Sequence, residues 1–196
     1  GAFRNRFGVP ITDEQLKDVP YYCPALDSPE IRYMMQRREA LQGVMPKRHS
    51  AVERLATPPL AAFSSQLASS GKREISTTMA FVRMLSTLVK DKEIGQRVVP
   101  IVPDEARTFG MEGMFRQLGI YSSVGQRYTP HDSGQIMFYK EDERGQILEE
   151  GINEAGAMSA WLAAATSFST SRFTMVPFYI FYSMFGFQRI GDLAWA

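Results

Sequence analysis

The sequence predicts an α/β domain built on a parallel sheet with helices on both faces, preceded by an irregular arm with short helices. Residues 97–102 (RVVPIV) and 176–182 (VPFYIFY) are apolar runs of strand length. Continuous apolar runs of this kind are typical of strands in parallel sheets, which are buried on both faces. Residues 146–149 add a short extended run, and from Ile152 the apolar period becomes helical. Strands and helices therefore alternate along the chain.

The composition excludes several classes of function. The chain has 196 residues, enough for one domain with a sizeable core and an arm. It carries 22 Lys and Arg against 21 Asp and Glu, so its charge gives no reason to expect nucleic acid or a membrane surface as a partner. Cys23 is the only cysteine, and His49 and His131 are the only histidines, so we expect no disulfide and no Cys/His metal site. The uncharged run at residues 173–187 is too short to span a bilayer. We expect a cytoplasmic protein.

Two regions follow from the order of the helix and turn signals. We expect residues 1–73 to form the arm and residues 74–196 the α/β domain, truncated within its last helix. In the arm, Thr12 and Gln15 have the spacing of a capping box. Ser28 precedes a proline that suits the first turn of a helix, which Gly43 can end. Residues 58–67 read as another short helix.

The domain begins with a helix that Ser76, Thr77 or Thr78 can cap, with a lysine-rich end that suits the helix dipole. Its buried side is expected to carry Phe81, Val82, Leu85, Leu88 and Val89. In the strand at residues 97–102, Pro100 cannot donate to a ladder, so we expect an edge strand or a bulge there. A helix at residues 109–118 should stop at Gly119.

The second half of the domain contains a long loop and the most apolar elements. Residues 122–145 show no clear periodicity, and a loop of this length is usually functional or disordered. We expect residues 122–140 to be mobile in the absence of a bound intermediate. The helix after Ile152 places four apolar residues on one face, namely Ala155, Met158, Leu162 and Ala165. The strand at residues 176–182 leads into a last helix.

Several residues fall where a parallel sheet binds ligands, at the carboxyl ends of its strands. Asp104 and Glu105 follow the strand at 97–102, Glu154 lies in the first turn of a helix that follows a strand, and Tyr182 and Phe185 follow the strand at 176–182. Each has a simpler explanation. Glu154 suits the dipole of its helix, the paired acids suit a solvated strand end, and the aromatic residues suit a core.

Four segments carry a resemblance to a known family: INEAGA, PFYIFYSMFGFQRIGD, DEARTFGMEGMFRQLGIYS and YKEDERGQILEEGINE. They closely resemble the thiamine-diphosphate-dependent pyruvate dehydrogenases of the homodimeric, bacterial type. The resemblance covers nearly the whole chain and corresponds to the middle, pyrimidine-binding domain. Family members are far longer, so we expect this chain to be one segment of such a protein.

The resemblance implies roles for the candidate residues. Glu154 falls on the activating glutamate, which hydrogen-bonds a ring nitrogen of the cofactor's aminopyrimidine and favours the imino tautomer that takes the proton from thiazolium C2. Ile152 supports the bent cofactor. Phe185 stacks on the aminopyrimidine, and Tyr182 lines the same pocket. Asp104 and Glu105 take active-site roles near the thiazolium, whereas no role follows for His131.

The resemblance also implies cofactors and partners. It implies thiamine diphosphate with Mg²⁺, although the Gly-Asp-Gly motif that holds the metal and diphosphate is absent, so we expect no metal ligand here. The reaction of this family decarboxylates pyruvate and acetylates the lipoyl domain of the dihydrolipoamide acetyltransferase. The resemblance also implies that the complete enzyme is a homodimer. We expect this chain alone to be inactive. Two alternatives remain. The chain could be the corresponding domain of a transketolase or 2-oxoglutarate dehydrogenase, or it could be a non-catalytic assembly fragment.

Overall fold

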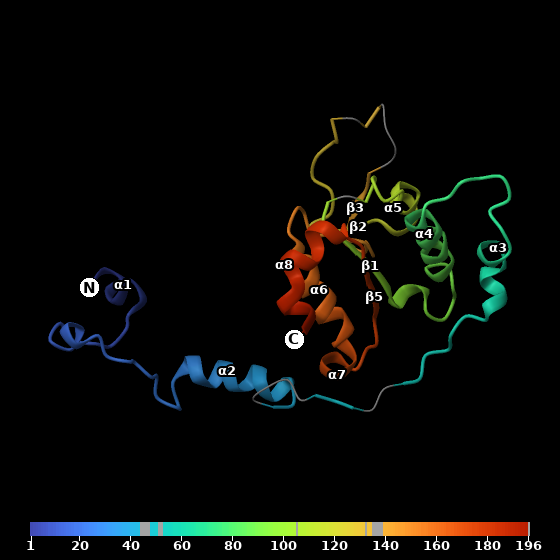
Figure 1. Cartoon of the computed structure of the whole chain (residues 1–196). Coiled ribbons are helices and arrows are strands. Elements are labelled where there is room, and N and C mark those ends of the chain that lie inside the picture. Colours follow the sequence, from blue (N-terminus) through green and yellow to red (C-terminus); the bar gives the residue numbers. More distant parts are fainter. Residues whose placement is uncertain (44–47, 51–52, 105, 132, 135–138, 196) are drawn as a thin grey trace. The chain divides into compact units, whose positions relative to one another are not determined.

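A computed structural model describes residues 1–43, 48–50, 53–104, 106–131, 133–134 and 139–195 (Figure 1). The chain divides into two compact units, Gly1–Lys47 and Arg48–Ala196. A boundary between residues 73 and 74 stays a prediction. The mobility expected of residues 122–140 also stays a prediction, and residues 132 and 135–138 of that loop lie outside the described residues.

The first unit contains α1 (Ala2–Phe7), the 3₁₀ helix η1 (Gln15–Asp18) and α2 (Pro29–Ala40), none of which has a buried residue. The capping box is confirmed, because the Thr12 amide donates to Gln15 Oε1 at 2.9 Å and the Gln15 amide donates to Thr12 Oγ1 at 3.2 Å. Ser28 caps α2 by accepting from the Ile31 amide at 3.4 Å. The helix stops earlier than Gly43, because Gln42 adopts the left-handed conformation at φ 63°.

The second unit begins with short helices, and its sheet starts after α4. Ser76 caps α4 as expected, because its side chain accepts from the Met79 amide at 3.1 Å. Its elements are η2 (Leu60–Phe63), α3 (Ser64–Leu67), α4 (Thr77–Leu88), η3 (Gly95–Arg97), β1 (Val98–Val102), α5 (Glu112–Leu118), β2 (Ile120–Tyr121), β3 (Glu141–Asp142), β4 (Leu148–Glu149), α6 (Glu154–Ala165), α7 (Ser167–Ser171), β5 (Val176–Tyr179) and α8 (Ser183–Trp195).

The described strands confirm the predicted fold class. β1 lies at the centre of a parallel sheet of order β4-β1-β5, with Ile101 opposite Leu148 of β4 and Val98 opposite Val176 of β5. The short strands β2 and β3 form a second parallel pair, which an isolated bridge between Ile120 and Ile147 connects to the segment before β4. Helices α6 and α8 lie on one side of β1 and β5, and α4 lies on the other (Figure 1).

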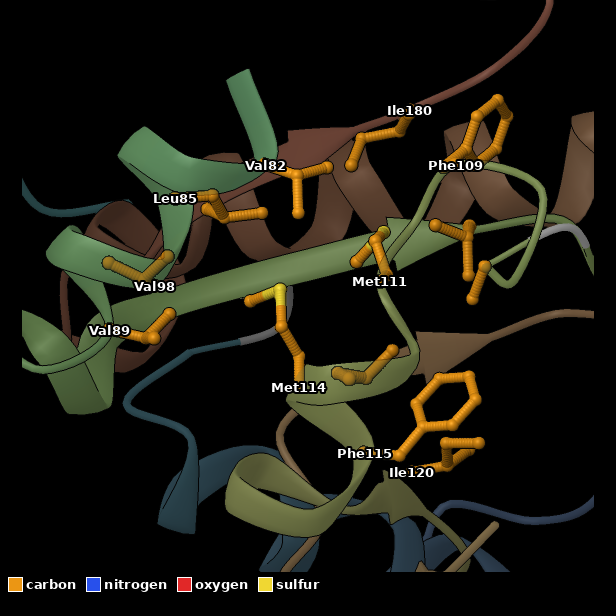
Figure 2. Packing of buried hydrophobic residues seen from close by; sticks show 13 residues of the cluster. Val82, Leu85, Val89, Val98, Phe109, Met111, Met114, Phe115, Ile120 and Ile180 are labelled. Atoms are coloured by element: carbon orange, nitrogen blue, oxygen red, sulfur yellow. The ribbon is translucent and has the colours of Figure 1, made fainter. Parts of the chain in front are cut away.

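The largest hydrophobic cluster lies on the α4 side of the sheet. Figure 2 shows Val82 and Leu85 of α4 and Phe115 of α5 gathered over β1. From β1 itself, Val98 and Val102 join this cluster. Because side chains alternate along a strand, the intervening positions face α6, which contacts β1 and β5.

Pro100 differs from its expectation, because it occupies the central strand and is buried. The Ile101 carbonyl accepts from the Ile180 amide on the β5 side, whereas the Val102 carbonyl accepts from the Glu150 amide on the β4 side. Residues of a parallel strand bond to its two neighbours alternately, so position 100 faces the β4 side. Strand β4 begins opposite Ile101, one residue later. The missing amide of proline therefore costs no ladder hydrogen bond.

Three element predictions need correction. The last strand ends at Tyr179 rather than residue 182 and is only partly buried, because β5 is an edge of the described sheet. Helix α5 begins at Glu112 rather than residue 109. Helix α6 buries Ala157, Met158 and Ala164, whereas Ala155 of the expected face is exposed. This helix is apolar on most sides, so spacing alone does not identify its buried face.

Gly145→Ala should destabilise the domain, because a Cβ at Gly145 would collide with the backbone of Ile120 and Tyr121. Backbone atoms of a paired strand cannot move aside cheaply, so we expect a loss of about 1–3 kcal/mol. The matched control is Gly113→Ala in α5, where a Cβ would meet nothing within 4 Å and alanine should gain about 0.5–1 kcal/mol. Urea unfolding measures both, and equal effects would contradict the argument.

Candidate active site

The segments that follow the three strands of the sheet meet around one pocket of about 20 Å³. It is lined by Pro103, Asp104, Ile152, Glu154, Phe181, Tyr182 and Phe185. The structure thus brings together all the predicted site residues that it describes. Glu105 lies outside the described residues.

Glu154 is the first residue of α6, and its carboxylate is the most enclosed charge of this pocket's wall. Asn153 caps the helix by accepting from the Gly156 amide at 3.0 Å. The Glu154 side chain is 11% exposed, and its Oε1 accepts from Nη1 of Arg189 in α8. The positive end of the α6 dipole and this guanidinium both stabilise this largely enclosed carboxylate.

Aromatic side chains form the wall beside the carboxylate. The rings of Tyr182 and Phe185 meet edge-on with centroids 6.5 Å apart, and Tyr182 lies 5.1 Å from the buried ring of Phe109. The Arg189 guanidinium carbon lies 5.4 Å from the centroid of Phe185. Tyr182 and Phe185 nevertheless remain 38% and 46% exposed. An anchored carboxylate thus lies beside an accessible aromatic surface.

Ile152 precedes Glu154 by two residues and is 82% exposed. An exposed isoleucine, an accessible aromatic ring and a carboxylate that accepts hydrogen bonds suit a flat heteroaromatic ring that carries nitrogen donors. A pocket of about 20 Å³ holds about one water molecule. Such a ring would therefore lie across these side chains, with its other face covered by groups outside this pocket.

Asp104 also lines two further cavities, of about 200 Å³ and 440 Å³, which share Tyr139 and Glu149. Burial, followed by the charge of Asp104, raises the pKa of Glu149 to about 6, and Tyr139 and Arg107 oppose this shift. The Tyr139 hydroxyl lies 3.2 Å from Glu141 Oε1 and 3.5 Å from Glu149 Oε2. The cluster is thus a second acidic region at the same edge of the sheet.

Sequence reasoning missed Arg189, Phe181 and Glu149. Arg189 had a visible signal, because it is the first charged residue after the uncharged residues 173–188. Phe181 lies within an apolar run that gives no reason to select it. Glu149 falls within a predicted strand, which gives no reason to select it. Only the pairing of Glu149 with Val102 shows that its carboxyl group is partly buried near Asp104.

No group of three or more His, Cys, Asp or Glu side chains that could hold a metal ion occurs in the described part of the chain. Within the same residues, no helix is long and apolar enough to cross a membrane.

Glu149→Gln should stabilise the protein at neutral pH. The pKa of Glu149 is raised from an ordinary 4.5 to about 6, so folding opposes its ionisation. Below pH 4.5 the side chain is protonated in both folded and unfolded states and carries no penalty, whereas a penalty develops as pH rises to 6. Unfolding free energies measured at several pH values should show that the stability of the Gln variant relative to the parent increases from pH 4.5 to pH 6. A gain of equal size at pH 4 would contradict this prediction.

Gly186→Ala should disturb the aromatic wall, because a Cβ at Gly186 would collide with the ring of Phe181. That ring also packs against Tyr179 and Phe187, at centroid distances of 4.7 Å and 5.5 Å, so it has little freedom to move. We expect a loss of about 1–3 kcal/mol and a changed near-ultraviolet circular dichroism spectrum. Gly191→Ala in the same helix meets nothing within 4 Å and should preserve the spectrum.

Comparison with known proteins identifies the family of this chain. Residues 57–196 match the family model of the pyruvate dehydrogenase E1 component middle domain. Proteins named pyruvate dehydrogenase E1 component are 65% identical over 195 residues in Pseudomonas aeruginosa, 59% over 195 in Cupriavidus necator and 56% over 194 in Escherichia coli K12. These alignments cover 98–100% of this chain and 22% of each relative, so the chain spans about a fifth of their length. The chain belongs to the family of pyruvate dehydrogenase E1 component middle domains.

Proposed function

We propose that this chain supplies the aminopyrimidine-binding half of a thiamine diphosphate site in a pyruvate dehydrogenase. The observation that carries this proposal is the convergence of Glu154, Ile152, Tyr182 and Phe185 on one pocket at the carboxyl edge of the sheet. The relatives carry the name pyruvate dehydrogenase E1 component. The proposed activity of the complete protein is decarboxylation of pyruvate with reductive acetylation of a lipoyl group.

Each side chain has a distinct task in this proposal. Bound thiamine diphosphate would supply the electron sink for decarboxylation. Glu154 carries a proton and exchanges it with a ring nitrogen of the aminopyrimidine. General acid–base chemistry requires a carboxyl group close to that nitrogen for this transfer. Phe185 offers its exposed face for stacking, and Ile152 supports the ring system from the other flank. Tyr182 fixes the position of Phe185 through their edge-on contact.

Asp104 lies where the Glu154 pocket adjoins the larger cavities. We assign it, together with Glu105, to the part of the site that faces the thiazolium and the substrate. The Mg²⁺ and diphosphate ligands belong to another part of the complete protein. Pyruvate, the lipoyl domain of the acetyltransferase and a second copy of the protein are the proposed partners, in the cytoplasm. The chain alone is expected to be inactive, because it holds only one side of the cofactor.

The arrangement of Glu154 argues against a purely structural fragment. A carboxylate whose only task is to favour the helix dipole can do so from a solvated position. The Glu154 side chain is instead largely enclosed, and a guanidinium from a different helix holds it beside exposed apolar residues. Desolvating a charge is costly, and an active site has a use for a carboxylate held in this way. Among enzyme alternatives, a transketolase or 2-oxoglutarate dehydrogenase is disfavoured by the identity of the relatives.

Glu154→Gln tests the proposal in a full-length E1 component that carries this sequence. Glutamine keeps the size of the side chain but cannot supply the carboxylic proton. We expect the exchange of the cofactor C2 proton for deuterium to slow by about 10²–10⁴, with the fold preserved. Exchange followed by nuclear magnetic resonance, with Mg²⁺ and thiamine diphosphate present, measures this effect.

Glu112→Gln is the matched control, because Glu112 also occupies the first turn of its helix, α5, but lines none of the three cavities that include Asp104. Removing a charge that acts only on the helix dipole should cost about 0.3–1 kcal/mol of stability and leave exchange unchanged. If Glu154→Gln behaves like this control, Glu154 is not the activating residue.

A further inference from the structure

The Tyr179 hydroxyl is buried and has no hydrogen-bond partner in the described part of the chain. Tyr179 is the last residue of β5. Its neighbour Ile180 belongs to the hydrophobic cluster on the α4 side, and Phe178 packs against that cluster. Strand alternation therefore directs Tyr179 to the opposite face, against which α6 packs. A buried hydroxyl without a partner is uncommon and requires an explanation.

The charged groups whose field reaches this hydroxyl are those of the candidate active site. Burial, followed by the charge of Glu154, raises the pKa of Tyr179 to about 12, and Arg189 opposes the shift. The hydroxyl is therefore neutral and able to donate at physiological pH. Its ring packs against Phe181, which lines the Glu154 pocket. The side chain thus belongs to the support of this pocket although it does not line it.

Of these two charged groups, only Glu154 can accept a hydrogen bond, because a guanidinium has donors alone. In the structure Arg189 occupies Oε1 of Glu154. We infer that Tyr179 is a positioning residue that donates its hydroxyl hydrogen to the Glu154 carboxylate while that carboxylate contacts the cofactor ring. In this inference the carboxylate turns toward the bound ring, so that one oxygen contacts the ring nitrogen and the other accepts from Tyr179. This inference rests on the proposed function.

The inferred hydrogen bond has a measurable consequence. A hydrogen bond to a carboxylate oxygen changes the frequency of the infrared stretching band of that carboxylate, so removal of the hydroxyl should shift the band of Glu154. The orientation of the carboxylate would also lose one of its constraints. A tyrosine that only fills space would affect stability but not the frequency of this band.

Tyr179→Phe in the full-length, cofactor-loaded E1 component tests the inference. Infrared difference spectra follow the stretching band of the Glu154 carboxylate, which is assigned by its loss in Glu154→Gln. We expect this band to shift in Tyr179→Phe relative to the parent, because the carboxylate loses a hydrogen-bond donor. Tyr33→Phe, at an exposed tyrosine of α2, should leave the band unchanged.

Two further measurements keep the outcomes separate. If Tyr179→Phe does not fold, 3-fluorotyrosine at position 179 keeps the hydroxyl, makes it a stronger donor and should shift the Glu154 band in the direction opposite to that expected for the Phe variant. An unchanged band in a folded Phe variant or with 3-fluorotyrosine overturns the inference. If Glu154→Gln slows C2 exchange while the band in Tyr179→Phe does not move, only the role of Tyr179 fails. If Glu154→Gln exchanges at the parent rate, the proposed function itself fails.

Discussion

The parallel pairing of β4 and β5 with β1 is the constraint on which the site depends. Because the three strands run in one direction, the segments that follow them emerge at the same edge of the sheet. Asp104, Glu154 and Tyr182 come from three such segments and share one pocket. Burial of β1 between α4 and α6 stabilises this pairing, so residues far from the pocket determine its geometry.

The Glu154–Arg189 pair makes the position of the carboxylate depend on α8 as well as α6. Removal of Arg189 should cost more than loss of an exposed ion pair, because the Glu154 charge that remains is largely desolvated. Arg189 is itself half exposed and lies over the ring of Phe185, so one cation orients both the carboxylate and part of the aromatic wall. Helix α8 thus contributes to the site through its packing on α6.

Local signals predicted the parts of the structure that depend on nearby residues. The caps at Ser76, Ser28 and Thr12 were predictable because a cap and its amide partner lie within three residues. The gathering of the site residues followed from the rule for strand ends. The partner of Glu154 was not predictable in this way, because Arg189 lies 35 residues away. The placement of Pro100 depended on where β4 begins, which residues 97–102 alone do not encode.

Two glutamates at this edge of the sheet lie in electrostatically different environments. Asp104 lines the pocket of Glu154 and also the two cavities that Glu149 lines. Glu154 has a guanidinium and a helix N-terminus beside it, whereas Glu149 faces another carboxylate and is partly buried. Ionisation of Glu149 around its raised pKa of about 6 places a new negative charge next to Asp104, which lines the Glu154 pocket. The field in the pocket therefore changes with pH through a residue outside it. A pH profile of proton exchange in this range would therefore contain the titration of Glu149, and a profile measured in a Glu149→Gln background removes that contribution.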